Sequence, residues 1–140
     1  MLVIFAGYLK EMDAMLNTNQ GLTGRFPYKY QFADYNADQL YEIACNLLSR
    51  DAYILSPEAE AQLRESVAKA YVQRDEHFSN ARWVEQFVNN GIIPAMASRL
   101  SDSACDDYQT IEVSDIRQAY TKFNPKAITL KPRQKVGFSA

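Results

Sequence analysis

A long run of helical spacing, from Asn36 to Tyr120, most constrains how this chain can fold. Asn36 and Gln39 have the spacing of a capping box, and apolar residues follow them at intervals of three and four. Ser56 before Pro57 is typical of a helix start, because the serine oxygen can accept a backbone N–H and the first helical position needs no donor. The run therefore predicts a mainly helical domain.

A third helix is expected after Ser79, which can cap it. Gly91 and Pro94 interrupt this helix. Proline removes a backbone donor and clashes with the preceding turn, so a kink or break is predicted near Asn90.

A short fourth helix lies between Ile111 and Tyr120, and its start is predicted near Ser114 or Asp115. The helical domain is therefore expected to hold about four helices and to cover residues 36–123. Residues 124–140 contain two prolines and no acidic residue, and they predict an extended tail.

The first 35 residues follow a different pattern. Residues 2–6 are continuously apolar, which is typical of a strand buried on both faces of a parallel sheet. A helix is expected from Leu9, with a break at residues 17–21, and residues 29–32 alternate as a second short strand does. This segment predicts part of an α/β core, with two strands and one helix.

Composition excludes several kinds of protein. With a net charge of −2, the 140-residue chain offers no broad electrostatic surface for nucleic acid or a membrane. Cys45 and Cys105 lie far apart in the sequence, which argues against a disulfide framework or a zinc site and fits a reducing compartment. There is one histidine, no metal site is expected, and no GxxxxGK[ST] phosphate loop occurs.

Two arginines stand out because each is held beside a turn or a helix start. Arg25 lies in "TGRFP" and Arg82 in "FSNARWV". Each can be an ordinary surface arginine. Each can also bind phosphate oxygens, since the guanidinium is planar, always charged and able to contact two oxygens at once.

Several motifs in order resemble the second half of the AAA+ ATPase module in the CbxX/CfxQ branch, which includes stage V sporulation protein K and the red-type rubisco activases. The resemblance covers residues 2–100. It rests on Ala6-Gly7-Tyr8, Asn19-Gln20-Gly21-Leu22, Gly24-Arg25-Phe26-Pro27, Phe32-Ala33-Asp34-Tyr35, Leu55-Ser56-Pro57-Glu58-Ala59 and Phe78-Ser79-Asn80-Ala81-Arg82.

The resemblance implies roles for four residues. Arg25 matches the arginine finger, which reaches the nucleotide of a neighbouring subunit. Arg82 matches sensor 2, which reaches the nucleotide of its own subunit, and Asn80 belongs to the same nucleotide-binding motif. Tyr8 falls at the sensor 1 position. A preorganised guanidinium would stabilise the charge that develops on phosphoryl oxygens.

The resemblance also implies ATP and Mg²⁺ as cofactors, a cytoplasmic ring of AAA+ subunits, a hexamer, and protein clients that the ring remodels. Residues 1–35 become a remnant of the α/β core and residues 36–123 the lid domain. The phosphate-binding loop and the magnesium-binding acids would lie upstream of Met1, so the chain is expected to be a fragment without ATPase activity of its own. Its unpaired first strand is expected to swap into a dimer or to refold against the helices.

A second interpretation stays open at the level of the sequence. The chain can be a stand-alone helical interaction module, derived from an AAA+ lid but without nucleotide chemistry. Such a module would bind a partner helix in a groove between its own helices.

Overall fold

The computed structural model describes residues 1–104 and 106–126 of the chain. The chain divides into two compact units, one from Met1 to Asp34 and one that begins at Tyr35. Most internal contacts belong to the second unit.

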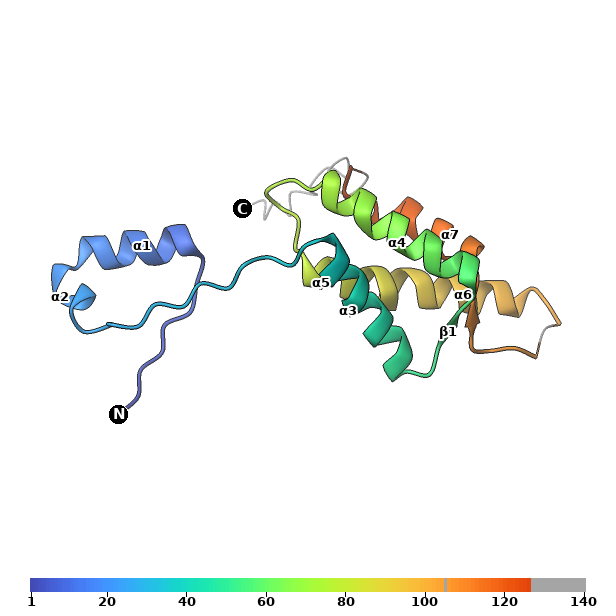
Figure 1. The fold of residues 1–140 in the computed structure, drawn as a ribbon, viewed down its shortest axis with the longest axis horizontal. Helices are drawn as coiled ribbons and strands as arrows, with labels where there is room; N and C mark the ends of the chain where they lie inside the picture. The colour runs from blue at the N-terminus through green and yellow to red at the C-terminus, as the bar shows by residue number, and fades with distance from the viewer. Residues whose placement is uncertain (105, 127–140) are drawn as a thin grey trace, which may run out of the picture. The chain divides into compact units, whose positions relative to one another are not determined.

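The first unit holds two helices, α1 (Leu9–Thr18) and the single turn α2 (Gln20–Thr23) (Figure 1). The helix predicted from Leu9 is therefore confirmed, and Asn19 separates it from α2. Leu16 is the one described apolar side chain of this unit that is buried.

The two strands predicted in this unit are wrong. Residues 2–6 and 29–32 form no β-structure, and their side chains are largely exposed, with Leu2 at 85% and Phe32 at 93%. A strand of this kind needs neighbours that satisfy its backbone N–H and C=O groups, and no described segment pairs with either run. Phe5 packs against Phe26 instead, with 4.7 Å between the ring centroids.

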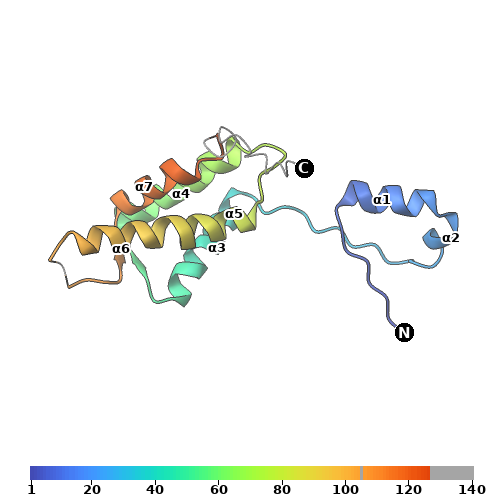
Figure 2. The ribbon, with the colours of Figure 1, turned by 180° about the vertical axis from the view of Figure 1, so that it is seen from behind.

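The second unit has the four-helix plan that the spacing predicts. Three of its elements, α5, η1 and α6, follow one another without a break and form one rod; we call it the α5–α6 rod. Figures 1 and 2 show α4 and α7 side by side along this rod, with α3 packed beside α4. The elements are α3 (Ala37–Arg50), α4 (Pro57–Val72), α5 (Ala81–Gln86), the π-helical η1 (Phe87–Ile92), α6 (Ile93–Ser101) and α7 (Val113–Phe123).

Two short parallel strands join distant parts of this unit. β1 (Ile54–Leu55) precedes α4, and β2 (Thr110–Ile111) precedes α7. Ile54 is in register with Thr110, and Leu55 with Ile111. Both strands in the described part of the chain therefore lie within the helical domain, where the sequence pattern does not predict them.

Both predicted helix starts at the head of the second unit are confirmed. The Asn36 side chain accepts the Gln39 N–H at 2.9 Å, and the Gln39 side chain accepts the Asn36 N–H at 3.0 Å. The Ser56 hydroxyl accepts the Ala59 N–H at 3.2 Å, directly before Pro57. These caps satisfy donors that the first helical turns leave unpaired.

No break occurs near Asn90, where a kink or break is predicted, because the helix continues through residues 87–92 as a wide π-helical segment. At Gly91 this segment lies close to α7, since a Cβ added there would stand 3.0 Å from both Ala119 Cβ and a ring carbon of Phe123. Pro94, which has no backbone N–H to donate, is the second residue of α6 and so comes directly after the π-helical segment.

The fourth predicted helix is confirmed as α7, which begins at Val113. Its cap is Glu112, paired with Asp115 in a capping box. The tail predicted at 124–140 falls mostly on residues 127–140, which lie outside the described residues. None of the described helices combines the length and apolar character that crossing a bilayer requires.

The core of the second unit is built from every helix of the unit. Its largest fully buried apolar side chains are Leu40, Leu48, Leu63, Val67, Val84, Phe87, Val88, Ile92, Ile111 and Ile116. The helical spacing that predicts the elements therefore also defines which of their faces are buried.

One buried ion pair holds the end of the rod to the last helix. Arg99 of α6 donates from Nε to Asp115 Oδ1 at 2.9 Å and from a terminal nitrogen to the Thr110 carbonyl at 2.9 Å. Asp115, which is 1% exposed, also accepts the Glu112 N–H at 3.0 Å. The pair therefore fixes β2 and the start of α7 against α6.

Candidate functional site

Arg82 occupies the first turn of α5, as the sequence predicts. Its backbone N–H donates to the Ser79 carbonyl at 3.1 Å. Its side chain is exposed and, among the described residues, makes no hydrogen bond or ion pair. The guanidinium is therefore free to bind an anion such as a phosphate group.

Asn80, and not Ser79, directly precedes α5, so the cap predicted at Ser79 is wrong. Asn80 has φ 52° and ψ −115°, a backbone conformation that residues other than glycine rarely adopt. Its side chain accepts no hydrogen bond from the first turn of α5. Its amide instead bonds the backbone of Tyr35 in both directions. Oδ1 accepts the Tyr35 N–H at 2.9 Å, and Nδ2 donates to the Tyr35 carbonyl at 3.0 Å.

Trp83, on the other side of Arg82, bonds the end of the last helix. Its indole Nε1 donates to the Phe123 carbonyl at 2.8 Å. Its ring stacks on Phe87, with 5.0 Å between centroids, and lies 5.5 Å from the ring of Phe78. Because Trp83 is 3% exposed, this bond forms in a well-packed environment.

Arg82 therefore lies between two residues that each hold another part of the second unit. Asn80 holds Tyr35, where the chain enters α3, and Trp83 holds Phe123, where α7 ends. The arginine side chain is exposed, while the turn that carries it is attached on both sides.

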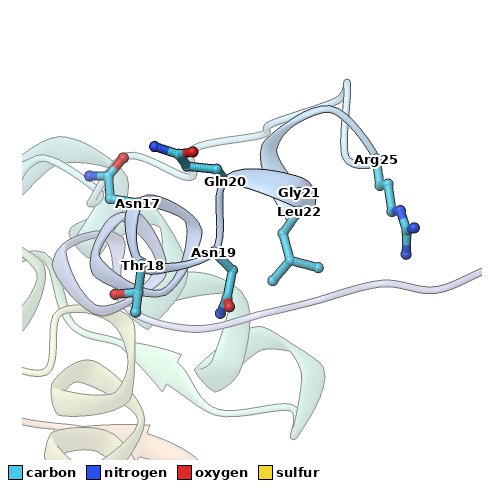
Figure 3. Close-up of a pocket in the computed structure, with 7 residues that line it drawn as sticks. All are labelled: Asn17, Thr18, Asn19, Gln20, Gly21, Leu22 and Arg25. Carbon is cyan, nitrogen blue, oxygen red and sulfur yellow. The ribbon is translucent and has the colours of Figure 1, made fainter.

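Arg25 lies in the first unit, just after α2. Its backbone N–H and that of Phe26 both donate to the Leu22 carbonyl, at 3.0 and 3.2 Å. Figure 3 shows its side chain reaching away from the turn, at one side of a hollow lined also by residues 17–22. The loop is held locally while the guanidinium is exposed.

Tyr8 also lies in the first unit, at the residue before α1. Its carbonyl accepts the Met12 N–H at 2.9 Å, and its side chain is 80% exposed. The structure thus brings Asn80 and Arg82 together at one helix start, whereas Arg25 and Tyr8 belong to the other unit. Among the described residues, no three acidic, histidine or cysteine side chains gather where a metal ion could be held.

No pattern in the sequence predicts the two hydrogen bonds on either side of Arg82. Tyr35 and Asn80 are 45 residues apart, and Trp83 and Phe123 are 40 apart. The "SNAR" stretch indicates a helix start, but nothing in it predicts that Asn80 bonds the backbone of a distant residue.

The helical unit matches a known family of protein domains. Residues 36–126 match the family model described as the AAA lid domain. The chain belongs to the AAA lid domain family. The match runs from the Asn36 cap of α3 to just beyond α7, and it contains Asn80, Arg82 and Trp83.

Known proteins of this family are similar over most of the chain. Stage V sporulation protein K of Bacillus subtilis (strain 168) is 36% identical over 118 residues, which is 82% of this chain and 37% of the relative. The chromosomal protein CbxX of Cupriavidus necator is 34% identical over 136 residues, 92% of this chain and 42% of the relative. The chloroplastic ribulose bisphosphate carboxylase/oxygenase activase of Cyanidioschyzon merolae is 32% identical over 126 residues, 83% of this chain and 40% of the relative.

The AAA lid domain chain spans about two fifths of the length of these relatives. The similarity to all three also extends beyond the lid match, since 82%, 92% and 83% of the chain exceed the share that residues 36–126 and the residues after them make up. Part of the first 35 residues is therefore related as well.

Proposed function

We propose that this chain is the sensor, arginine-finger and lid segment of an AAA+ ATPase that remodels protein clients in a ring of subunits. The observation that carries the proposal is the AAA lid match over residues 36–126, together with Arg82, which stands in the first turn of α5 and has no side-chain partner within residues 1–104 and 106–126. ATP and Mg²⁺ are the cofactors of this activity. Their phosphate-binding loop and acidic ligands would come from sequence outside these 140 residues.

Arg82 is the nucleotide sensor of the lid in this proposal. A guanidinium on a rigid helix start can reach the phosphate oxygens of a nucleotide bound by its own subunit. Its exposure and lack of a partner support this role, because no ion pair has to break first. The role predicted for Asn80 as a direct nucleotide contact stays a prediction, and both its amide atoms are already bonded to Tyr35.

Arg25 is the finger offered to the neighbouring subunit. Its exposed side chain and its loop, held by two bonds to the Leu22 carbonyl, suit a group that has to reach outward. A finger supplied in trans is worth about 10³ to 10⁵ in the rate of phosphoryl transfer. Tyr8 keeps the predicted sensor 1 position, where its exposed side chain can meet another chain or segment.

Neighbouring AAA+ subunits are the first partners, in a hexameric and cytoplasmic ring. The name of one relative, a rubisco activase, indicates that proteins of this kind act on another protein. For this chain the client is proposed only as a class, a folded protein that the ring remodels.

Subunit mixing tests the proposal. The longer polypeptide that joins this chain to a phosphate-binding segment is prepared as wild type and as Arg25→Ala, and ATP turnover is measured at several mixing ratios. We expect the variant to lose about 10³-fold in turnover. In mixtures, each Arg25→Ala subunit should abolish ATP turnover at the site of the neighbouring subunit, while its own nucleotide site can still turn over ATP when its other neighbour is wild type.

Arg50→Ala is the matched control, because Arg50 is an exposed arginine at the far end of α3. It should leave turnover unchanged. Full turnover by Arg25→Ala, or turnover by the 140-residue chain alone, would contradict the proposal. A chain that binds a helical partner and leaves nucleotide turnover unaffected would favour the stand-alone module.

A further inference from the structure

The Asn80 side chain makes an unusual use of its position. An asparagine before a helix ordinarily accepts a backbone N–H from the first turn and so satisfies an unpaired donor. Asn80 makes no such bond, and both ends of its amide go to one residue, Tyr35, in another part of the sequence. The paired bonds, at 2.9 and 3.0 Å, reproduce the way two strands pair at one residue.

The backbone of Asn80 is strained to make this arrangement. Its φ of 52° with ψ of −115° is a region that only glycine visits readily, so holding a residue with a side chain there is unfavourable. Such conformations persist where surrounding contacts over-determine them. The two bonds to Tyr35 and the burial of Asn80 are the contacts present here.

Tyr35 and Asn80 each directly precede the start of a helix or its cap. Tyr35 is the first residue of the second unit, and it directly precedes the Asn36 cap of α3. Asn80 carries the carbonyl that receives the Val84 N–H at 3.3 Å, so it anchors the helical turn that bears Arg82. The bonds therefore join the point where the chain enters the lid to the turn that presents the arginine.

We infer that Asn80 is a positioning residue whose amide clasps the Tyr35 backbone, so that the chain entering the lid and the turn carrying Arg82 move as one piece. A contact at Arg82 then acts on the segment before α3 without passing through the helical core. The inference rests on the proposed function in one respect, that Arg82 meets a nucleotide. The clasp between Asn80 and Tyr35 can be tested without any ligand.

Asn80→Gly isolates the clasp. Glycine adopts φ 52° without strain, so the variant loses the amide and keeps the backbone path. We expect the Tyr35 amide hydrogen to exchange with solvent about tenfold faster or more, as loss of one or two hydrogen bonds implies. The Arg82 amide should follow it. Amides in the middle of α4 should keep their wild-type rates, as read by NMR on the 140-residue chain.

Two further variants separate a local clasp from a general loss of stability. Trp83→Phe removes the bond to the Phe123 carbonyl and keeps an aromatic ring, and it should leave Tyr35 protected. Leu63→Ala lowers the stability of the whole unit and should accelerate every slowly exchanging amide together. If Asn80→Gly does not fold, Asn80→Ala serves, because it removes both amide atoms that bond Tyr35 and should accelerate exchange at Tyr35 more than in the core.

Tyr35 exchange that is unchanged in Asn80→Gly or Asn80→Ala, or that rises only in step with the amides of α4, would overturn the inference. Selective release of Tyr35 and Arg82 supports it. An Arg82→Ala variant that binds nucleotide normally would count against the proposed function and leave the clasp intact, so the two failures are distinguishable.

Discussion

The two units of this chain contain similar residues and differ in what those residues can bury. From Tyr35 onward, apolar side chains of α3, α4, β2, the α5–α6 rod and α7 pack against one another, and ten described Leu, Ile, Val and Phe residues among them are fully buried. In the first unit the run at residues 2–6 is at least as apolar, yet its side chains are exposed. Helices satisfy their own backbone, whereas a strand needs partner strands that these described residues do not supply.

The largest expected effect contrasts one leucine from each unit. Leu63→Ala removes a fully buried side chain from α4 and should cost about 2–5 kcal/mol of unfolding free energy. Leu2→Ala alters a side chain that is 85% exposed and should change stability by less than about 0.5 kcal/mol. Urea unfolding followed by Trp83 fluorescence and by circular dichroism measures both. A large loss in Leu2→Ala would break the comparison, because it would mean that the first run packs after all.

The next contrast concerns two aspartates. Asp115→Ala leaves the Arg99 guanidinium without its buried carboxylate and the Glu112 N–H without its acceptor. We expect a loss of about 3 kcal/mol, at the lower end for a broken buried pair because Arg99 is partly exposed. Asp13→Ala, in the exposed part of α1, should have no measurable effect in the same unfolding assay. Equal effects of the two changes would show that the ion pair contributes nothing.

Two glycines give a third contrast. An added methyl at Gly91 would stand 3.0 Å from Ala119 and Phe123, so Gly91→Ala should cost about 1–3 kcal/mol through overpacking. Gly21 has open space around it in α2, so Gly21→Ala should be neutral or slightly stabilising. Thermal unfolding distinguishes them. A Gly91→Ala variant as stable as the wild type would imply that the η1 segment and α7 are not in close contact.

The smallest contrast is between two tyrosines within the second unit. The Tyr41 hydroxyl donates to Glu60 at 2.9 Å, so Tyr41→Phe should cost about 1 kcal/mol. The buried Tyr120 hydroxyl has no partner among the described residues, so Tyr120→Phe should cost nothing. The opposite ranking in urea unfolding would show that the hydroxyl contacts are assigned to the wrong residue.

The burial of the Tyr41 hydroxyl also makes the stability of the second unit depend on pH. Burial, aided by hydrogen bonds with Cys45 and Glu60, raises the pKa of Tyr41 well above its usual range. Tyrosine in the unfolded chain ionises near pH ~10. The stability that the neutral folded form contributes is therefore present below pH ~10 and lost as pH rises from there toward the raised folded pKa. Tyr41→Phe should make the alkaline loss of stability shallower.

The parts of the fold that depend on neighbours in sequence could be predicted. The Asn36–Gln39 capping box and the Ser56–Pro57 helix start are local signals. Gly91 and Pro94 likewise indicate an irregular stretch of helix, which the structure shows as the π-helical segment η1. The prediction of strands at residues 2–6 and 29–32 is wrong because a strand-like sequence pattern does not by itself provide a second strand to pair with. β1 and β2 are two residues each and pair across 56 positions, Ile54 to Thr110, which no local pattern reveals.

The candidate site divides in the same way. The place of Arg82 in the first turn of α5 follows from helix spacing, and the sequence predicts it. The bonds from Asn80 to Tyr35 and from Trp83 to Phe123 depend on how the four helices pack, so only the structure shows them. Ser79 was expected as the cap because serine is a common cap residue, but the chain bends one residue later, at the strained Asn80.

Nucleotide affinity tests the central claim, that the lid presents Arg82 to a bound nucleotide, most directly. Calorimetric titration of Mg²⁺-ATP into the longer polypeptide compares Arg82→Ala with the Arg50→Ala control. Loss of a charge-assisted contact to phosphate should weaken binding about tenfold to a hundredfold in Arg82→Ala, while Arg50→Ala binds as the wild type does. Equal affinity of Arg82→Ala and the wild type would contradict the claim.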